Sequence, residues 1–244
     1  MSKLPRFFIA PPQVQGSLIT VSGDDMRHIR TVLRKKPGDA LILADGQGME
    51  YRVKIVQINR SEITTEIVSE VRKELRYPLV TLGQGLPKSE KMDWIVQKAT
   101  ELGVARIVPL VTERTIVKIR DEEKRVSRWQ KIAREAAMQS NRVDIPEVDH
   151  IRTFHDFIMT LDPGPMTLLL FPWEEGTEPI KNVLRQKPDV KNIIVLIGPE
   201  GGFSSVEAEL AKENGFHLVS LGAGILRTET AAVAALSMIV YEYL

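Results

Sequence analysis

From residue 79 to the end of the chain, short apolar runs alternate with segments that have the periodicity of amphipathic helices. Strands are expected at 79–83, 106–111, 166–171, 192–197 and 217–221, and helices at 89–102, 122–140, 153–160, 178–186, 204–214 and 228–243. Regular alternation of this kind predicts a parallel sheet that is covered by helices on both faces. The larger part of the chain is therefore expected to have an α/β fold.

The preceding residues have a different pattern, in which short strands are separated by turns rich in Pro, Gly and Asp. Strands are expected at 6–10, 17–21, 40–44, 50–58 and 62–68. One helix, expected at 24–35 with an apolar stripe of Ile29, Val32 and Leu33, interrupts this series of strands. These features predict a small β-barrel with one helix at 1–74, and the polar stretch 70–78 is expected to link it to a second domain at 75–244.

The composition is that of a soluble globular protein, with 43% hydrophobic and 27% charged residues. No apolar run is long enough to cross a bilayer, and the N-terminal sequence MSKLPRFF lacks the apolar core of a secretory signal. The chain has no cysteine, and its 4 histidines lie far apart in the sequence. No membrane segment, disulfide or metal site is therefore expected, and a cytoplasmic location is favoured.

Basic residues are concentrated in the N-terminal part, although the net charge of the whole chain is only +1. Residues 1–74 contain 12 basic and 9 acidic side chains, and Arg27, Arg30 and Arg34 share one face of the helix expected at 24–35. Such a face suits a phosphate backbone. An ordinary solvated helix face explains the same pattern equally well, so both interpretations stay open.

Three of the expected strands end in unusual sequences, at 171–174, 198–202 and 222–230. Ligands of open α/β sheets bind beyond the carboxyl ends of the strands, where glycines allow the backbone to approach a ligand closely. A single glycine turn is usually only a connection, but three neighbouring turns that carry Glu, Arg or Trp predict a pocket. Ser204 and Thr228 are expected to cap the helices that follow two of these turns.

The glycine-rich sequences do not match the common nucleotide-binding motifs. GxxxxGK[ST] is absent, which argues against a P-loop enzyme. Gly83-Gln-Gly85 follows an expected strand, but it lacks the third glycine of a dinucleotide-binding turn, and Pro87 precedes the next helix. The GxG pair is therefore not interpreted as a cofactor site.

The chain contains the segments LIGPEGGFS (196–204) and SLGAGILRTETAA (220–232), together with PRFF (5–8), HIRTVLRKKPGD (28–39), KSEKMDWIVQKATELGV (88–104), RWQKIAREAAMQSNR (128–142) and IPEV (145–148). In these segments it resembles the SPOUT methyltransferases, and within them the RsmE family of 16S rRNA uracil-N3 methyltransferases. These segments follow one another in a single order along nearly the whole chain. One departure is Gly224, where the family often has a bulky or basic residue.

The resemblance implies a PUA-like RNA-binding barrel at 1–74 and a SPOUT α/β domain at 75–244 with a deep C-terminal trefoil knot. It further implies a homodimer with S-adenosylmethionine as the methyl donor. The implied substrate is a uridine in the decoding region of 16S rRNA of the small ribosomal subunit, methylated at N3. In such a knot the last strand ends lie side by side and wrap the cofactor together.

By position, the resemblance implies which residues contact the cofactor, mainly through the backbone. These are Phe171, Gly198, Glu200, Gly201, Gly202, Leu221, Gly222, Ile225 and Leu226. Arg227 is the candidate for stabilising negative charge on the uracil, and Glu229 for accepting the proton or orienting Arg227. The candidates for RNA contact are Arg6, Arg27, Arg30, Arg34, Asn141 and Arg142.

Several of these residues also have a purely structural explanation. Arg227 and Glu229 could pair with each other, and Asn141 with Arg142 could end the helix expected at 122–140. The helix at 228–243 is apolar on nearly every face, which predicts burial on more than one side, either by a second protomer or by one large core. Phe7 and Phe8 are expected in the barrel core rather than stacked on an extruded base.

Two other functions fit the same pocket motifs. One is a related methyltransferase that modifies the ribose 2′-oxygen or a different RNA base. The other is an RNA-binding scaffold that holds the cofactor without turnover.

Overall fold

The computed structural model describes residues 4–73, 78–117 and 120–243. The chain divides into two compact units, the first with the bounds Met1–Leu75 and Ala137–Ile145, the second with Arg76–Ala136 and Pro146–Leu244. The linker expected at 70–78 was predicted to begin too early, because a strand extends to Arg72; its residues 74–77 lie outside the described residues.

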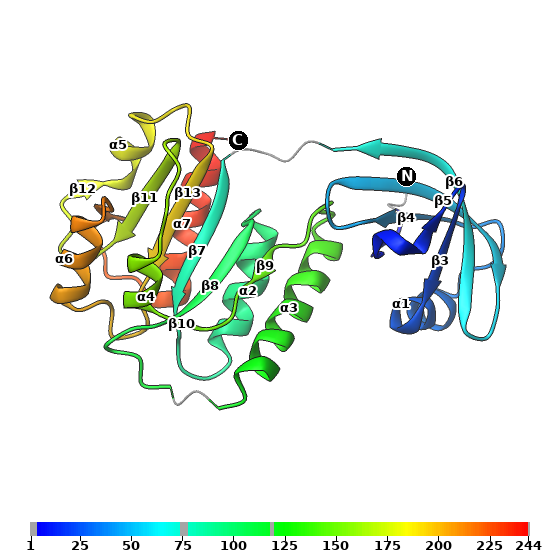
Figure 1. Cartoon of the computed structure of the whole chain (residues 1–244), viewed down its shortest axis with the longest axis horizontal. Coiled ribbons are helices and arrows are strands. Elements are labelled where there is room, and N and C mark those ends of the chain that lie inside the picture. The colour runs from blue at the N-terminus through cyan, green and yellow to red at the C-terminus, as the bar shows by residue number, and fades with distance from the viewer. Residues whose placement is uncertain (1–3, 74–77, 118–119, 244) are drawn as a thin grey trace. The chain divides into compact units, whose positions relative to one another are not determined.

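The first unit is built on a six-stranded sheet with the order β1-β4-β5-β6-β3-β2. Figure 1 labels β3, β4, β5 and β6 of this sheet. Its strands are β1 Arg6–Phe8, β2 Val14–Gln15, β3 Leu18–Ser22, β4 Ala40–Ala44, β5 Met49–Ile58 and β6 Glu62–Arg72. β1 runs parallel to β4, and the other neighbouring strands are antiparallel. The five predicted strands are confirmed, whereas β2 was not predicted because two residues are too few to show a periodicity.

A 3₁₀ turn at Pro11–Gln13 precedes β2 in this unit. The helical segment follows β3; it begins as α1 Gly23–Arg27 and continues as a π-helical turn, η2 His28–Val32. Met26 and Ile29 pack into the core together with Phe7, and Phe8 is also buried, as predicted. Val32 was expected on the buried stripe, but it is 66% exposed. The wider π turn, closed by the bond from Leu33 N–H to the His28 carbonyl (3.0 Å), shifts the phase of the α-helical pattern.

The second unit contains a parallel sheet with the order β10-β8-β7-β13-β11-β14-β12 and a further strand, β9, beside β8. The strands are β7 Leu79–Gly85, β8 Arg106–Val111, β9 Glu147–Val148, β10 Arg152–Thr153, β11 Thr167–Pro172, β12 Glu178–Pro179, β13 Asn192–Ile197 and β14 His217–Ser220. All the pairings are parallel, which confirms the predicted sheet. The three two-residue strands were not predicted.

Helices cover both faces of this sheet (Figure 1). They are α2 Lys91–Glu101, α3 Glu122–Gln139, α4 Phe154–Met159, α5 Ile180–Arg185, α6 Ser205–Glu213 and α7 Thr228–Tyr243. Side chains of β13 alternate between two cores: Ile193 and Val195 pack with α2, α3, α5 and α7, whereas Ile194 and Leu196 pack with α4 and α6. A strand that is buried on both faces explains the continuous apolar run of β13.

The last helix, α7, fills much of one core. It buries Ala232, Ala235, Leu236 and Ile239, and it contacts α2, α5 and β13 of the same chain. Within the described residues, no helix combines the length and the apolar character needed to span a bilayer.

The two glycines of Gly83-Gln-Gly85 allow β7 to pack closely against its neighbours. A Cβ at Gly83 would lie 2.3 Å from Leu196 Cδ2, and a Cβ at Gly85 would lie 2.6 Å from both the nitrogen and Cδ of Pro199. Pro199 belongs to the glycine turn that follows β13. The GxG pair is therefore needed for packing, and it brings β7 against this turn.

We expect Gly85→Ala to lower the free energy of unfolding by about 2 kcal/mol, because the added methyl group meets backbone atoms that cannot rotate away. Gly164→Ala is the matched control, since a Cβ at Gly164 has no heavy atom within 4 Å. Denaturant unfolding of both variants measures the difference. Equal stability of the two variants would contradict this account of the glycine pair.

Candidate active site

A pocket lies at the carboxyl ends of β11, β13 and β14, where the sequence predicted one. It is lined by Pro172, Trp173, Glu174, Ile197, Gly198, Pro199, Glu200, Gly201, Gly202, Phe203, Ser220, Leu221, Gly222, Ala223, Gly224, Ile225, Leu226, Thr228 and Ala231, and it encloses about 210 Å³. We call it the glycine pocket, and its two loops the 198–202 loop and the 221–226 loop. A glycine-lined pocket at this edge of a parallel sheet defines a ligand-binding α/β protein.

Eight of the nine cofactor candidates line the glycine pocket, and Phe171 does not. Phe171 is fully buried, and its ring centroid lies 4.4 Å from that of Phe203 within an aromatic cluster. The lining residues from the end of β11 and the turn after it are Pro172, Trp173 and Glu174. They belong to the stretch 171–174 that the sequence predicted at the pocket, although only Phe171 was named as a cofactor contact.

The 198–202 loop is held by hydrogen bonds from two other parts of the unit. The Thr228 hydroxyl donates to the Gly198 carbonyl oxygen (2.6 Å) and accepts from Nε2 of the buried Gln84 (2.9 Å). Nη1 of Arg114 donates to the Gly201 carbonyl oxygen (2.8 Å). Thr228 was expected to cap α7, but it is the first residue of that helix, and its hydroxyl is used to bind the loop.

The helix after this loop begins as predicted. Ser204 caps α6, accepting a bond from the Glu207 N–H, while the Glu207 carboxylate accepts from the Ser204 N–H (2.9 Å) in a capping box. The second carboxylate oxygen of Glu207 accepts the Glu113 N–H (2.9 Å). These bonds fix the exit of the 198–202 loop.

The 221–226 loop has the features of a ligand-recognition segment. Residues 223–226 form no backbone hydrogen bond with the other described residues, so their N–H and C=O groups are available to a ligand. Ile225 is 87% exposed and Leu226 is 37% exposed, although both are apolar. Apolar walls beside free backbone groups fit a ligand with a flat heterocycle and polar edges, such as a nucleoside.

The two predicted catalytic residues do not pair with each other. Arg227 is exposed, and among the described residues its guanidinium has no hydrogen-bond or ion-pair partner. Oε2 of Glu229 lies 3.4 Å from Nζ of Lys91, which also lies 3.0 Å from Oε1 of Glu200. Arg227 is thus free to bind a substrate, whereas Glu229 is held by a lysine that the sequence did not single out.

Burial and ionic contacts act in opposite directions on Glu200. Burial raises its pKa, but the contact with Lys91 and hydrogen bonds from the backbone N–H groups of Glu200 and Lys88 outweigh burial and keep the pKa below its ordinary value. On Lys91, the contact with Glu200 has the largest effect and, with a further contribution from Glu229, raises the pKa. Both groups are therefore charged at neutral pH.

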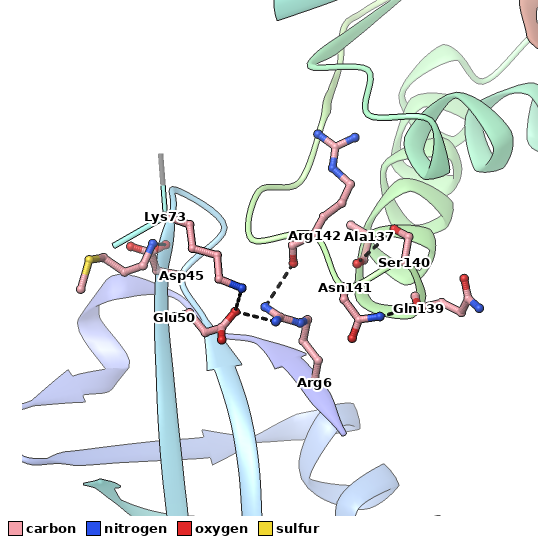
Figure 2. Close-up of polar contacts among 10 residues, drawn as sticks. Arg6, Asp45, Glu50, Lys73, Ala137, Gln139, Ser140, Asn141 and Arg142 are labelled. Atoms are coloured by element: carbon pink, nitrogen blue, oxygen red, sulfur yellow. Dashed lines mark hydrogen bonds and ion pairs between the residues drawn. The ribbon is translucent and has the colours of Figure 1, made fainter. Parts of the chain in front are cut away.

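In the first unit, Arg6 is buried rather than presented to a ligand (Figure 2). Its side chain is 6% exposed; Nη2 lies 2.5 Å from Oε2 of Glu50, and Nη1 donates to the Arg142 carbonyl oxygen (3.3 Å). Burial raises the pKa of Glu50, but Lys73 and Arg6 together hold it below its ordinary value. Arg6 thus connects the sheet of this unit to its 137–145 segment. Isolated β-bridges from Gly46 and Gln47 to Asp144 join the same two parts.

Asn141 and Arg142 end helix α3, as their structural explanation predicted. Asn141 has a left-handed backbone with φ of 61°, and its N–H donates to the Met138 carbonyl oxygen (3.3 Å). The Arg142 N–H donates to the Ala137 carbonyl oxygen (3.0 Å), and this pair of bonds forms a Schellman motif. The Arg142 guanidinium pairs with Asp144, and its side chain points away from Arg6 (Figure 2).

The predicted basic face of the first unit is exposed. Arg27 pairs with Asp24 at 2.5 Å, and Arg30 lies near the carbonyl oxygens of Asn59 and Arg60. Arg34 was expected on the same helix face, but it lies beyond the end of η2 at Val32; it is exposed, in a left-handed conformation with φ of 51°. Among the described residues there is no group of three or more acidic or histidine side chains that could hold a metal ion.

Residues 73–240 match the family model of the RNA methyltransferase domain, and residues 21–68 match that of the RNA methyltransferase PUA domain. The chain is 30% identical to ribosomal RNA small subunit methyltransferase E of Bacillus subtilis (strain 168), over 98% of this chain and 97% of that protein. It is 35% identical to the protein of the same name from Synechocystis sp., over 96% of this chain and 76% of that protein.

A solved structure shows the same fold. The crystal structure of a ribosomal RNA small subunit methyltransferase E from Neisseria gonorrhoeae bound to S-adenosyl methionine has 30% sequence identity and a TM-score of 0.87, covering 99% of this chain and 98% of that chain. The fold is thus that of an RNA methyltransferase with a PUA-like N-terminal domain. Within that class, the chain belongs to the ribosomal RNA small subunit methyltransferase E (RsmE) family, which confirms the resemblance drawn from its motifs.

Thr228→Val keeps the shape of the side chain but leaves the Gly198 carbonyl and one N–H of buried Gln84 without a partner. We expect a loss of about 2 kcal/mol in the free energy of unfolding, which is the usual cost of unsatisfied buried polar groups. Thr230→Val is the matched control, because Thr230 is exposed on the same helix. Urea unfolding that gives the same loss for both variants would show that the Thr228 hydroxyl does not hold the loop.

Proposed function

We propose that this protein uses S-adenosylmethionine to methylate N3 of a uridine in the decoding region of 16S rRNA of the small ribosomal subunit. The observation that carries the proposal is the glycine pocket, which has Arg227 at its rim in a chain that matches small-subunit rRNA methyltransferases from end to end. The curated relatives are named for the substrate subunit, and the position of the methyl group rests on the family resemblance.

The glycine pocket fits the cofactor in its chemistry. The free backbone groups of 223–226 suit the polar edge of adenine, and Ile225 and Leu226 suit its faces. We assign the rest of the molecule to the 198–202 loop, which lines the same pocket. The backbone of this loop packs tightly, since a Cβ at Gly198 would lie 3.0 Å from the Gly202 backbone. When bound, S-adenosylmethionine supplies an electrophilic methyl group.

The chemistry of uracil defines what the protein must provide. N3 bears an imide proton and becomes a good nucleophile only when that proton leaves, and the resulting negative charge spreads over O2 and O4. We assign Arg227 to stabilising this charge, since its guanidinium is exposed beside the pocket without a protein partner among the described residues. Glu229, two residues further along α7, is assigned to accepting the proton; the alternative role of orienting Arg227 is less favoured, because Glu229 is paired with Lys91.

The first unit is proposed to hold the RNA. The exposed Arg27, Arg30 and Arg34 would contact phosphates, and Asn141 would approach the target nucleotide from the end of α3. Arg6 and the Arg142 guanidinium are engaged in ion pairs, so we assign them to shaping this surface rather than to direct contact. The target base must leave its stack to reach a pocket of this kind.

The remaining parts of the proposal concern topology and assembly. We propose that the segment from β13 to α7 forms the trefoil knot of the SPOUT fold and that two copies form a homodimer, with the cytoplasm as the site of action. The half-exposed Trp94 on α2 and the exposed Tyr241 on α7 are consistent with a further contact on this pair of helices.

The function is tested by incubating the protein with small ribosomal subunits and labelled S-adenosylmethionine, then digesting the rRNA to nucleosides for mass analysis. We expect a single labelled 3-methyluridine. A label on 2′-O-methylnucleoside or on another base would identify the related activity. Cofactor binding without transfer, measured by calorimetry, would identify a scaffold.

Arg227→Ala is expected to slow single-turnover methylation at saturating cofactor by about 10²-fold, the usual effect of removing one donor that stabilises developing charge. Cofactor affinity should change little, because Arg227 is not among the residues that line the pocket. Arg185→Ala is the control, since Arg185 pairs with Glu242 on helices α5 and α7 and does not line the pocket. An unchanged rate for Arg227→Ala would remove this residue from the chemistry.

A further inference from the structure

Lys91 lies between the two acidic residues of the site. Its Nζ is 3.0 Å from Oε1 of Glu200, on the 198–202 loop, and 3.4 Å from Oε2 of Glu229, in the first turn of α7. The same Oε2 of Glu229 is buried and accepts no hydrogen bond from the described residues. The ammonium group of Lys91 is therefore the only cation paired with this carboxylate oxygen among the described residues.

The position of Lys91 in its own helix is unfavourable. It is the first residue of α2, where the helix dipole and the free N–H groups favour an anion over a cation. Helix stability therefore does not explain this lysine. The two carboxylates compensate for the unfavourable position, which suggests that the lysine serves the site rather than the helix.

Glu200 is held on a second side as well. The Lys88 N–H donates to its two carboxylate oxygens at 3.1 Å and 3.2 Å. The side chain thus ties the 198–202 loop, which lines the glycine pocket, to the start of α2. The ion pair between Lys91 and Glu229 connects the start of α2 to the first turn of α7, next to Arg227.

We propose that Lys91 is a positioning residue that couples the 198–202 loop to the start of α7, so that the pocket wall and Arg227 keep a fixed geometry. This inference rests on the proposed function, because the benefit of a fixed geometry is cofactor binding and methyl transfer. An ordinary exposed ion pair would contribute little. Lys91 differs because it joins two segments that are far apart in sequence and both belong to the site.

Lys98 offers a matched comparison on the same helix. Its side chain is 33% exposed, against 34% for Lys91, and within the described part of the chain its one ion-pair partner is Glu101, three residues away. Lys98→Met therefore removes the same charge from α2 without separating any part of the pocket.

The test compares Lys91→Met, Lys91→Arg and Lys98→Met with the wild type, using S-adenosylmethionine as the calorimetric probe and circular dichroism to verify folding. We expect Lys91→Met to weaken binding roughly tenfold, a usual size for coupling between sites, and to lower the single-turnover rate at saturating cofactor. Lys91→Arg should restore most of both, and Lys98→Met should match the wild type.

The pH profile of binding separates an ionic role from simple packing. The charged groups that face Glu200 are Lys91 of α2 and, across that lysine, Glu229 of α7; Glu174 lines the same pocket, and Arg114 contacts the neighbouring Gly201. Because Lys91 helps to lower the pKa of Glu200, the wild type should keep its affinity as the pH falls to the ordinary pKa of a glutamate. In Lys91→Met, Glu200 should become protonated at a higher pH than in the wild type, and the affinity for S-adenosylmethionine should fall at that higher pH.

If Lys91→Met does not fold, Glu200→Gln removes the ion pair between Lys91 and Glu200 and should give a similar loss of affinity. Because the glutamine cannot be protonated, the affinity of this variant should not fall further at low pH. The proposal is overturned if Lys91→Met behaves like Lys98→Met in affinity, pH profile and rate. Failure of the proposed function has a different signature, in which the wild type binds the cofactor but methylates no small-subunit rRNA. Binding then still decides the role of Lys91, because this measurement needs no RNA.

Discussion

The Thr228 hydroxyl forms the contact on which the glycine pocket depends. It accepts a hydrogen bond from Gln84 in the middle of the sheet and donates one to Gly198, so a single oxygen joins β7, the 198–202 loop and the start of α7. Gln84 and Thr228 are both buried, and an unmade hydrogen bond is costly for a buried group. The pocket wall therefore has one stable position, which also fixes the residues beside Thr228.

The site combines this fixed wall with parts that are free to bind. The 198–202 loop is held at Gly198 and Gly201, and its exit is held by the capping box of α6. The 221–226 loop has free backbone groups and exposed apolar side chains. Preorganised contacts beside unpaired recognition groups are what a methyl-transfer site requires, because positioning supplies much of the rate.

Charged residues divide in the same way between structure and function. Arg6, Arg142 and Lys91 are committed to carboxylates within the protein, whereas Arg227 and Arg34 are exposed. The committed residues shape surfaces that belong to the proposed RNA and cofactor sites. An arginine in a motif is thus a candidate for ligand contact only after its protein partners are known.

The sequence by itself determined the main elements, the parallel sheet and the location of the pocket. β8, β13 and α7 have the predicted bounds, because periodicity and glycine turns are local properties of the chain. Full-length motifs further determined the family. The exposure of Val32 in the π turn was not predicted, because a local pattern does not show whether a helix is α or π. The burial of Phe171 was not predicted either, because the pattern does not show which aromatic residue at a strand end reaches the surface.

Only the tertiary structure decided the partners of the polar side chains. Gln84 and Thr228 are 144 positions apart, and Arg6 and Arg142 are 136 apart, so no periodicity connects them. The same holds for Lys91 and its two glutamates, which meet because parallel strands bring the ends of distant segments to one edge of the sheet. Hydrogen bonds and ion pairs depend on distance in space, which the order of residues along the chain does not contain.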